Sequence, residues 1–143
     1  MSAEDNVKLV QRLFEKHNRG AAEVMGSYEQ LFHPDLEWLP VIVGGPEGAS
    51  YRGKDGLERW YAQRDDSFAS ASVEIETCRA MAPDVVLALG RSIAKGRASG
   101  AEVSEEVGLV ISFEDGLIRL DCAYGSHSEA EQAAKRLVAE QHA

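Results

Sequence analysis

Four side chains of the sequence could bind a ligand or transfer a proton beside apolar residues, namely Glu37, Tyr61, Arg91 and Asp121. A carboxylate in apolar surroundings can exchange protons near neutral pH, because burial raises its pKa. An arginine can hold a ligand carboxylate through two parallel hydrogen bonds, and a buried tyrosine hydroxyl needs a partner. In an enzyme, Arg91 would anchor the ligand, Tyr61 would donate a hydrogen bond, and Glu37 or Asp121 would move the proton.

Arg91 belongs to a segment, residues 85–93, in which every second residue is apolar. It shares the parity of Val85 and Ile93, so a regular strand points it toward the interior. Because a buried guanidinium requires a partner, Arg91 either clamps a ligand carboxylate, orients a catalytic acid, or forms a structural ion pair. A strand end already in solvent is the remaining alternative.

The two carboxylates also leave alternatives open. Asp121 alternates with the apolar residues Leu120 and Cys122, so in a regular strand it lies on the outer, solvent-facing side, near Arg119. A β-bulge near Ala123 would reverse that facing and bring Asp121 into a cavity. Glu37 is the only carboxylate of the short segment 36–39, and it acts either as a base with a raised pKa or as a solvated side chain.

No cofactor or metal is expected. The four histidines, His17, His33, His127 and His142, have no second histidine at ligand spacing. The sequence has no phosphate-cradling loop or redox motif, and Cys78 and Cys122 are far apart. Any catalysis is therefore expected to be acid–base chemistry such as cyclisation, dehydration or hydrolysis.

Bulk composition limits the function classes. A chain of 143 residues with 44% hydrophobic and 27% charged residues is expected to form one globular domain, 1–143. The net charge of -9 argues against nucleic acid and anionic membranes as partners. No apolar run approaches the ~20 residues of a spanning helix, and the N-terminus lacks a signal-peptide pattern, so we expect a cytoplasmic protein.

Helical patterns dominate the first half of the chain. Ser2 with Asp5 predicts a capped helix that ends at Gly20. An apolar stripe over 22–32 predicts a second helix that Pro34 ends, and 36–39 forms a short strand. Residues 41–53 predict a loop, either a lid over a cavity or a connector. A third helix starts at 54.

The second half alternates with the period of strands. Segments 73–77, 85–93, 103–113 and 118–124 are expected strands, with Asp115-Gly116 as the tight turn between the last two. A final amphipathic helix covers about 128–141. Helices followed by long antiparallel strands indicate an α+β fold.

Two segments carry a family resemblance. Gly44–Tyr61 is a run of turn formers that leads into a helix with Trp60 and Tyr61 on one face, and Phe113–Arg119 holds the Asp-Gly turn. Their order and spacing resemble the nuclear transport factor 2-like superfamily, specifically its SnoaL-like branch, to which ketosteroid isomerases and polyketide cyclases are related. The resemblance implies a curved antiparallel sheet wrapped around the N-terminal helices, a cone-shaped α+β barrel with a cavity.

The resemblance also implies which residues line the cavity. Its expected wall consists of Leu13, Phe32, Trp38, Leu39, Trp60, Leu109 and Tyr124. The three positions that carry catalytic groups in ketosteroid isomerases correspond here to leucines, and a one-residue shift at the second offers only Trp38 or Pro40. Leucine neither accepts nor donates a proton, so the isomerase route is excluded. Related cyclases and epoxide hydrolases use an acid on the last strand, where this chain has Asp121.

The sequence therefore predicts a SnoaL-like pocket protein that binds a small apolar molecule with a carbonyl or carboxylate group. It is either a cofactor-free acid–base enzyme or a non-catalytic binding or scaffold module whose side chains fill the pocket. Cavity volume separates the two. A homodimer through the outer sheet face is also expected, because one face of the 85–94 strand is small, with Val86, Ala88, Gly90, Ser92 and Ala94.

Overall fold

The computed structural model describes residues 2–40 and 50–141, so most of the predicted loop at 41–53 lies outside the described residues. The elements follow in the order α1 (Ala3–Arg19), α2 (Ala21–Met25), α3 (Tyr28–Leu31), β1 (Phe32–Leu39), β2 (Tyr51–Arg52), α4 (Gly53–Ser67), β3 (Phe68–Ala82), β4 (Val85–Gly96), β5 (Glu102–Glu114), β6 (Leu117–Tyr124) and α5 (His127–Gln141).

Helix α1 forms as the sequence predicts. The Ser2 hydroxyl accepts a hydrogen bond from the Asp5 backbone N–H, and the Asp5 carboxylate accepts one from the Ser2 N–H, both at 3.1 Å. This reciprocal capping satisfies N–H groups that have no partner within the helix. Gly20 ends the helix at φ 128°, a conformation that side chains disfavour. The buried face of α1 carries Val10 and Phe14 toward the sheet.

The predicted second helix over 22–32 is wrong in its extent. It is divided into α2 and α3, and Phe32 already belongs to β1 and pairs with Ile118 of β6. Pro34 therefore lies inside a strand rather than at a helix end. It falls where the β1–β6 register is interrupted, between Phe32 and Glu37, so its missing N–H removes no bond from the ladder.

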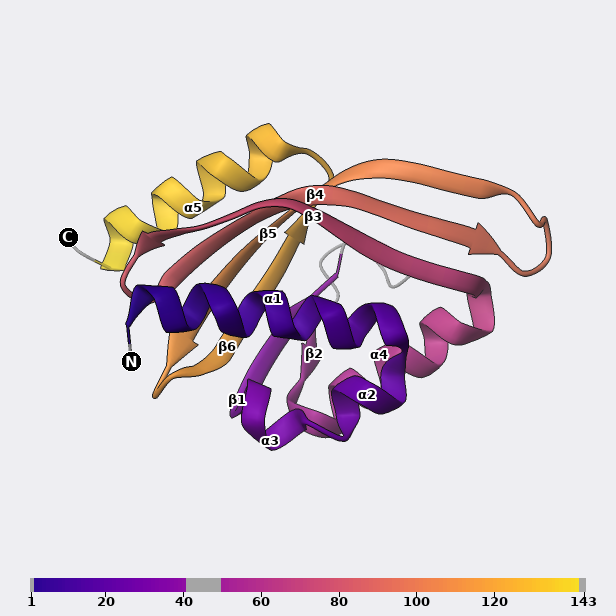
Figure 1. The fold of residues 1–143 in the computed structure, drawn as a ribbon, viewed down its shortest axis with the longest axis horizontal. Coiled ribbons are helices and arrows are strands. Elements are labelled where there is room, and N and C mark those ends of the chain that lie inside the picture. Colours follow the sequence, from indigo (N-terminus) through magenta and orange to yellow (C-terminus); the bar gives the residue numbers. More distant parts are fainter. Residues whose placement is uncertain (1, 41–49, 142–143) are drawn as a thin grey trace.

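The six strands form one sheet in the order β2-β1-β6-β5-β4-β3. All neighbours are antiparallel except β1 and β6, which run parallel. Helix α1 crosses one face of the curved sheet, and α5 lies against the opposite face (Figure 1). The predicted α+β fold is confirmed, but the sheet is open and does not close into a barrel.

Each face of the sheet buries its own apolar cluster. The inner face, under α1, includes Val86, Ala88 and Leu109. The outer face contributes Val85, Leu87 and Val110, which pack against Ala130, Ala133 and Ala134 of α5. The expectation that the small face of β4 points outward is therefore wrong. Both faces are apolar, so alternation alone does not tell which one meets α1 and which one meets α5.

The turn between β5 and β6 is the predicted Asp-Gly hairpin. Asp115 and Gly116 have φ values of 55° and 76°, and positive φ at both central residues suits the twist of an antiparallel pair. This turn holds the register in which Phe113 lies opposite Ile118.

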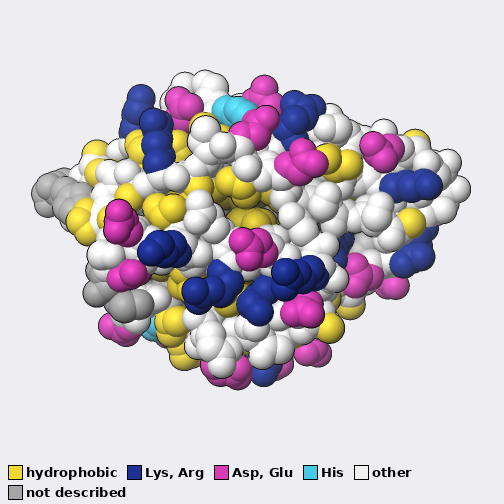
Figure 2. Space-filling model, viewed as in Figure 1, with side chains coloured by type: hydrophobic (Ala, Val, Ile, Leu, Met, Phe, Trp, Pro, Cys, Tyr) yellow, Lys and Arg dark blue, Asp and Glu magenta, His cyan; other side chains and the backbone are white. Residues whose placement is uncertain are grey.

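The surface carries both signs of charge. Acidic and basic side chains are intermixed over the face shown in Figure 2, with apolar side chains between them. Among the helices that the structure describes, none is long and apolar enough to cross a membrane.

Candidate functional site

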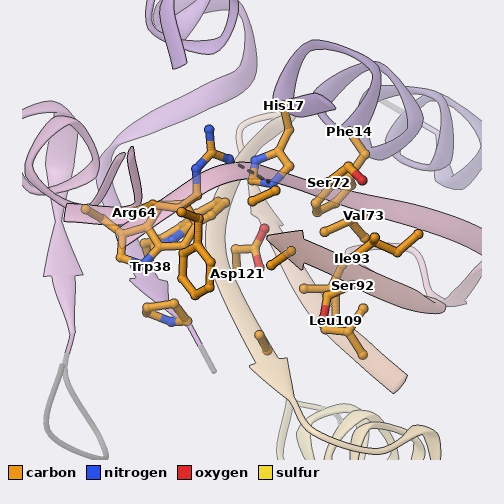
Figure 3. A pocket seen from close by; sticks show the side chains of 17 residues that line it. Phe14, His17, Trp38, Arg64, Ser72, Val73, Ser92, Ile93, Leu109 and Asp121 are labelled. Atoms are coloured by element: carbon orange, nitrogen blue, oxygen red, sulfur yellow. Dashed lines mark hydrogen bonds between the residues drawn. The ribbon is translucent and has the colours of Figure 1, made fainter. Parts of the chain in front are cut away.

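A cavity of about 70 Å³ lies between α1, α4 and the inner face of the sheet. One water molecule needs about 10–15 Å³ by this measure, so the cavity has room for on the order of five waters. Its walls are mainly apolar and aromatic, and its ionisable residues are His17, Arg64 and Asp121 (Figure 3).

Asp121 is the buried acid of this cavity. Its side chain points into the cavity from β6 (Figure 3), the residue is only 2% exposed, and its Oδ2 atom has no hydrogen-bond partner in the part of the chain that the structure describes. Burial raises the pKa of Asp121 to about 7, because the charged form loses its hydration. The carboxyl is thus set to exchange a proton near neutral pH.

A β-bulge brings Asp121 inside. Ser112 of β5 lies opposite Leu120, while the next residue, Phe113, lies opposite Ile118, which leaves Arg119 as the extra residue. The bulge shifts the alternation, so Ile118 and Asp121 both face the interior. The sequence prediction allowed for such a bulge near Ala123, and the structure has it at Arg119.

His17 forms a buried chain of contacts with residues of α4. Its Nδ1 atom lies 2.7 Å from the Tyr61 hydroxyl, and its Nε2 atom lies 3.5 Å from Nη1 of Arg64. Burial, and then the nearby Arg64 charge, lower the pKa of His17 to about 3, so the ring is neutral. Because a guanidinium only donates, Nε2 is assigned as the acceptor, and Nδ1–H then donates to Tyr61.

Arg64 is neutralised locally. Its Nη2 and Nε atoms lie 3.2 and 3.3 Å from one Asp65 carboxylate oxygen, and its guanidinium lies over the Tyr61 ring at 4.8 Å. No ion pair within 4.0 Å links it to Asp121 in the described residues. Arg64 therefore does not hold Asp121 in its ionised form.

Five of the seven residues expected to line the cavity lie on its side of the sheet, and they form two groups. Trp38, Trp60 and Leu109 line the cavity. Leu13 and Phe32 are fully buried in the surrounding core and do not line it.

Tyr61 is also behind the cavity wall. It is 1% exposed and bonded to His17, and burial raises its pKa above the usual range. The Tyr61 hydroxyl accepts the hydrogen bond from His17 and so orients the imidazole ring, while Tyr61 itself does not line the cavity.

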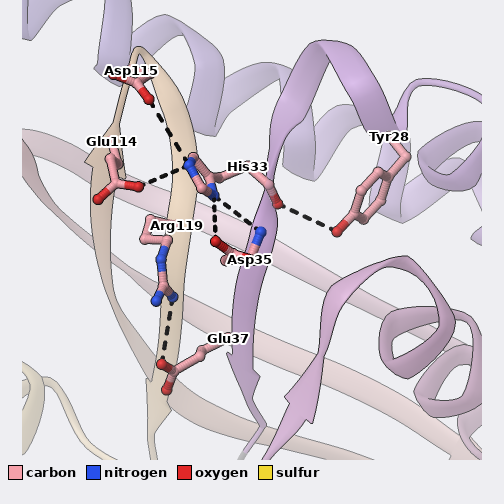
Figure 4. A network of polar contacts seen from close by, with 7 residues as sticks. All are labelled: Tyr28, His33, Asp35, Glu37, Glu114, Asp115 and Arg119. Carbon is pink, nitrogen blue, oxygen red and sulfur yellow. Dashed lines mark hydrogen bonds and ion pairs between the residues drawn. The ribbon is translucent and has the colours of Figure 1, made fainter.

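Glu37 and Leu39 face the opposite side of the sheet. On β1 the inward residues are Leu36 and Trp38, so the residues that alternate with them turn away from the cavity. Glu37 accepts a hydrogen bond of 3.4 Å from Arg119 in a half-buried ion pair (Figure 4). The expectation that these two residues reach the cavity is wrong, because the inward parity of β1 is the even one.

Arg91 and Tyr124 likewise lie on the outer face. Arg91 donates from Nε to the Ser104 hydroxyl and from Nη2 to the Ser104 carbonyl, both at 3.0 Å. Tyr124 packs against the cluster under α5. Both were expected to point inward, and both expectations are wrong. The small residues of β4 occupy the inner face, so Arg91 faces outward, and the bulge at Arg119 that turns Asp121 inward turns Tyr124 outward.

The positions expected to correspond to isomerase groups carry no ionisable side chain. Leu13 and Leu109 are buried and apolar, and at the end of β1 the residues that line the cavity are Trp38 and Pro40. The only carboxylate in the cavity wall is Asp121, among the residues that the structure describes.

Sequence reasoning missed the roles of His17 and Arg64. A signal for each exists in the helical spacing. His17 continues the buried stripe of Val10, Leu13 and Phe14, and Arg64 follows Trp60 by one helical turn.

The residues that could hold a metal lie elsewhere. His33 Nε2 is 2.7 Å from a Glu114 oxygen and 3.9 Å from an Asp115 oxygen, beside the β5–β6 turn (Figure 4). Their ligand atoms all lie within 4.8 Å of one another, and both carboxylates are exposed. Exposed acidic groups of this kind commonly occur without an ion.

The sequence pattern of the SnoaL-like domain matches residues 10–120. Among curated proteins no relative matches. Three solved structures of similar fold illustrate the range of the relatives. A nuclear transport factor 2-like protein of unknown function from Burkholderia pseudomallei is 16% identical, with a TM-score of 0.71 and coverage of 90% of this chain and 95% of the other.

Of the other two, one is named for a putative activity and one was crystallised with a ligand. A putative SnoaL-like polyketide cyclase from Jannaschia is 15% identical, with a TM-score of 0.71 and coverage of 92% of both chains. TerC, co-crystallised with polyporic acid, is 13% identical, with a TM-score of 0.70 and coverage of 92% of this chain and 98% of TerC. At these identities the similarity shows a nuclear transport factor 2-like fold.

Proposed function

Because the chain belongs to the SnoaL-like domain family, we propose that it is a cofactor-free acid–base enzyme acting on a small, largely apolar carbonyl compound. Asp121 is the proton-transfer group. The observation that carries the proposal is this buried carboxyl, whose pKa of about 7 and unpartnered oxygen are set in an apolar cavity. Perturbed carboxyls in clefts are typical of catalytic acids and bases.

The environment of Asp121 suits a group that both takes and returns a proton. At neutral pH the acid and the carboxylate are about equally populated, which is the optimum for general acid–base catalysis. An ion pair would depress the pKa and weaken the base, but Arg64 pairs with Asp65 instead. His17 is neutral and does not compete for the proton.

The apolar walls favour a ligand with few charges. Carbonyl compounds fit this description because they are uncharged. Their carbonyl oxygen also acidifies the neighbouring α-protons, which Asp121 could then remove. TerC, which was co-crystallised with polyporic acid, and the putative polyketide cyclase support a carbonyl ligand by similarity of fold. Ring closure between such compounds begins with the removal of an α-proton.

The test is exchange of α-protons for deuterium. Cyclohexanone, phenylacetone and acetylacetone are each incubated with the protein in D₂O and followed by proton NMR. The proposal predicts exchange faster than in buffer, and a loss of at least about 100-fold in Asp121→Asn, since general bases contribute 10²–10⁴-fold. Glu37→Gln is the matched control, an acid removed from the opposite face of the sheet. Exchange that is absent in the wild type, or unaffected in Asp121→Asn, would contradict the proposal.

The size of the cavity favours a second candidate, a non-catalytic binding or scaffold module. A volume of about 70 Å³ is below the roughly 300–1,000 Å³ of sites for drug-sized ligands. If no ketone raises the melting temperature, the scaffold is favoured, because a ligand that binds only the folded chain must stabilise it.

The homodimer remains a prediction for either candidate. Helix α5 mainly covers β4 and β5 on the outer face, so the outer surface available for a dimer lies over the strands on either side, β1 and β6 and also β3. A mass measurement in solution tests it.

A further inference from the structure

We infer that the indole N–H groups of Trp38 and Trp60 together bind the carbonyl oxygen of the ligand, beside Asp121. The inference rests on the proposed function and names the donors that would recognise its substrate. Three buried polar atoms around the cavity have no partner in the part of the chain that the structure describes, and these are Trp38 Nε1, Trp60 Nε1 and Asp121 Oδ2.

The grouping of these atoms is the central observation. The other buried atoms without a partner belong to Asn6 and Asp84. Asn6 donates to the Pro83 carbonyl, so this second pair lies at the turn between β3 and β4, away from the cavity. Leaving a buried donor without an acceptor destabilises a folded chain, and such groups are rare in cores. Three of these five buried atoms without a partner in the described part of the chain therefore belong to residues that line the cavity.

The fold places the three groups together from three elements. Trp38 of β1 is the register partner of Asp121 on the neighbouring strand β6, and both face inward. Trp60 comes from α4, and its ring centroid lies 5.3 Å from that of Trp38. Each of the three polar atoms exposes less than 1 Å², so a ligand oxygen would reach the N–H groups through a rotation of the indole rings.

The donors select the chemistry of the ligand. An indole N–H only donates, so its complement is an acceptor, and one carbonyl oxygen has two lone pairs for the two donors. A cationic ligand would be attracted by Asp121. It would be repelled by the positive ends of the two N–H dipoles and by the Arg64 guanidinium, which lies 5.8 Å from the Trp60 ring centroid. An oxygen acceptor that becomes more negative during the reaction fits better than an ammonium group.

The donors also assist the proton transfer. The Asp121 carboxylate takes an α-proton, so the C–H bond breaks and an O–H bond forms on Asp121. The C–H electron pair becomes the carbon–carbon double bond, and the carbonyl π pair moves to the oxygen. The indole N–H groups stabilise this enolate oxygen more strongly than the neutral carbonyl. Return of the proton from Asp121 restores the carboxylate, and no other reactant is consumed.

The first experiment compares two ligands of the same shape. Cyclohexanone carries the oxygen acceptor, and methylenecyclohexane has a CH₂ group in its place. Binding of both is measured for the wild type, Trp38→Phe, Trp60→Phe and the double variant. Phenylalanine keeps an aromatic ring and removes the N–H. We expect the wild type to prefer the ketone, each single variant to lose roughly two- to tenfold of that preference, and the double variant to lose all of it.

A matched control removes a donor from an aromatic ring outside the cavity. Tyr51→Phe deletes a hydroxyl that donates to Gln63 at 2.6 Å, and it should leave the preference for the ketone unchanged. A preference that survives in the double variant overturns the inference. So does a wild type that shows no preference or binds neither ligand.

A second measurement needs no variant to fold. The chain has two tryptophans, so the wild type gives two indole ¹H–¹⁵N signals. Cyclohexanone should shift both downfield and methylenecyclohexane should not, and equal shifts with both ligands overturn the inference. If both signals respond as expected but Asp121→Asn leaves α-proton exchange unchanged, the inference about the two indole donors holds and the proposed catalytic role of Asp121 is wrong.

Discussion

Two buried groups of the cavity should make the stability of the fold depend on pH in opposite directions. The pKa of Asp121 is about 7 in the folded chain and 3.8 for the free group, so the folded state binds more protons between these values. Its free energy of unfolding therefore falls as the pH rises through this window. The pKa of His17 is about 3 folded and 6.5 free, so the unfolded state binds more protons, and stability rises with pH there.

The two effects are of similar size. Each group contributes a slope of about 1.4 kcal/mol per pH unit between its two pKa values. The windows overlap between about pH 4 and 6.5, where the slopes from Asp121 and His17 nearly cancel. If either group is removed, the slope from the other is no longer cancelled, and the free energy of unfolding then changes by about 3 kcal/mol across the overlap.

Asp121→Asn should therefore lose about 3 kcal/mol relative to the wild type as the pH falls from 6.5 to 4, because only the His17 slope remains. His17→Gln should show the opposite trend and lose a similar amount as the pH rises over the same range. Urea unfolding at several pH values, followed by tryptophan fluorescence, gives both curves, with Glu37→Gln as the control. If the difference between Asp121→Asn and the wild type does not vary with pH, the reasoning is refuted.

Three further substitutions test the fold and the facing of the strands. Gly90→Ala should destabilise by about 1–3 kcal/mol or more in chemical denaturation, because the new Cβ would overlap the Glu74 backbone carbonyl; a neutral effect would contradict the packing of β3 on β4. Gly108→Val should cost a similar amount, because the side chain would collide with Ala130, and hydrogen exchange should rise in α5; unchanged protection would count against that packing. Arg91→Leu should change stability by no more than about 0.5 kcal/mol and leave ketone binding intact, because the Arg91 contact with Ser104 is exposed. If the variant folds normally but no longer binds a ketone, Arg91 belongs to the binding site after all.

The helices and the turns were the predictable part of the fold. Capping at Ser2, the stop at Gly20 and the Asp115-Gly116 turn depend on local backbone preferences, which a short sequence window contains. The division of the second helix was missed because Phe32 pairs with Ile118, which is remote in sequence. Tertiary pairing outweighed a helical pattern there.

The facing of the strands was the unpredictable part of the site. Residues 85–89 are apolar without interruption, so either parity of β4 could meet α1, and Arg91 was assigned to the wrong face. Asp121 is inside only because the extra residue Arg119 shifts the alternation of β6, and a bulge depends on both strands rather than on one. His17 and Arg64 were within reach, because their spacing continues the buried stripes of α1 and α4.

The most direct test of an acid–base cavity is the pKa of Asp121 itself. Protein labelled with ¹³C at the aspartate carboxyl carbons is titrated by NMR, and Asp121→Asn identifies the signal. A buried carboxyl in this cavity predicts a midpoint near 7. A midpoint near the ordinary value of 3.8 would mean that Asp121 is hydrated or ion-paired, and it would contradict the proton-transfer role.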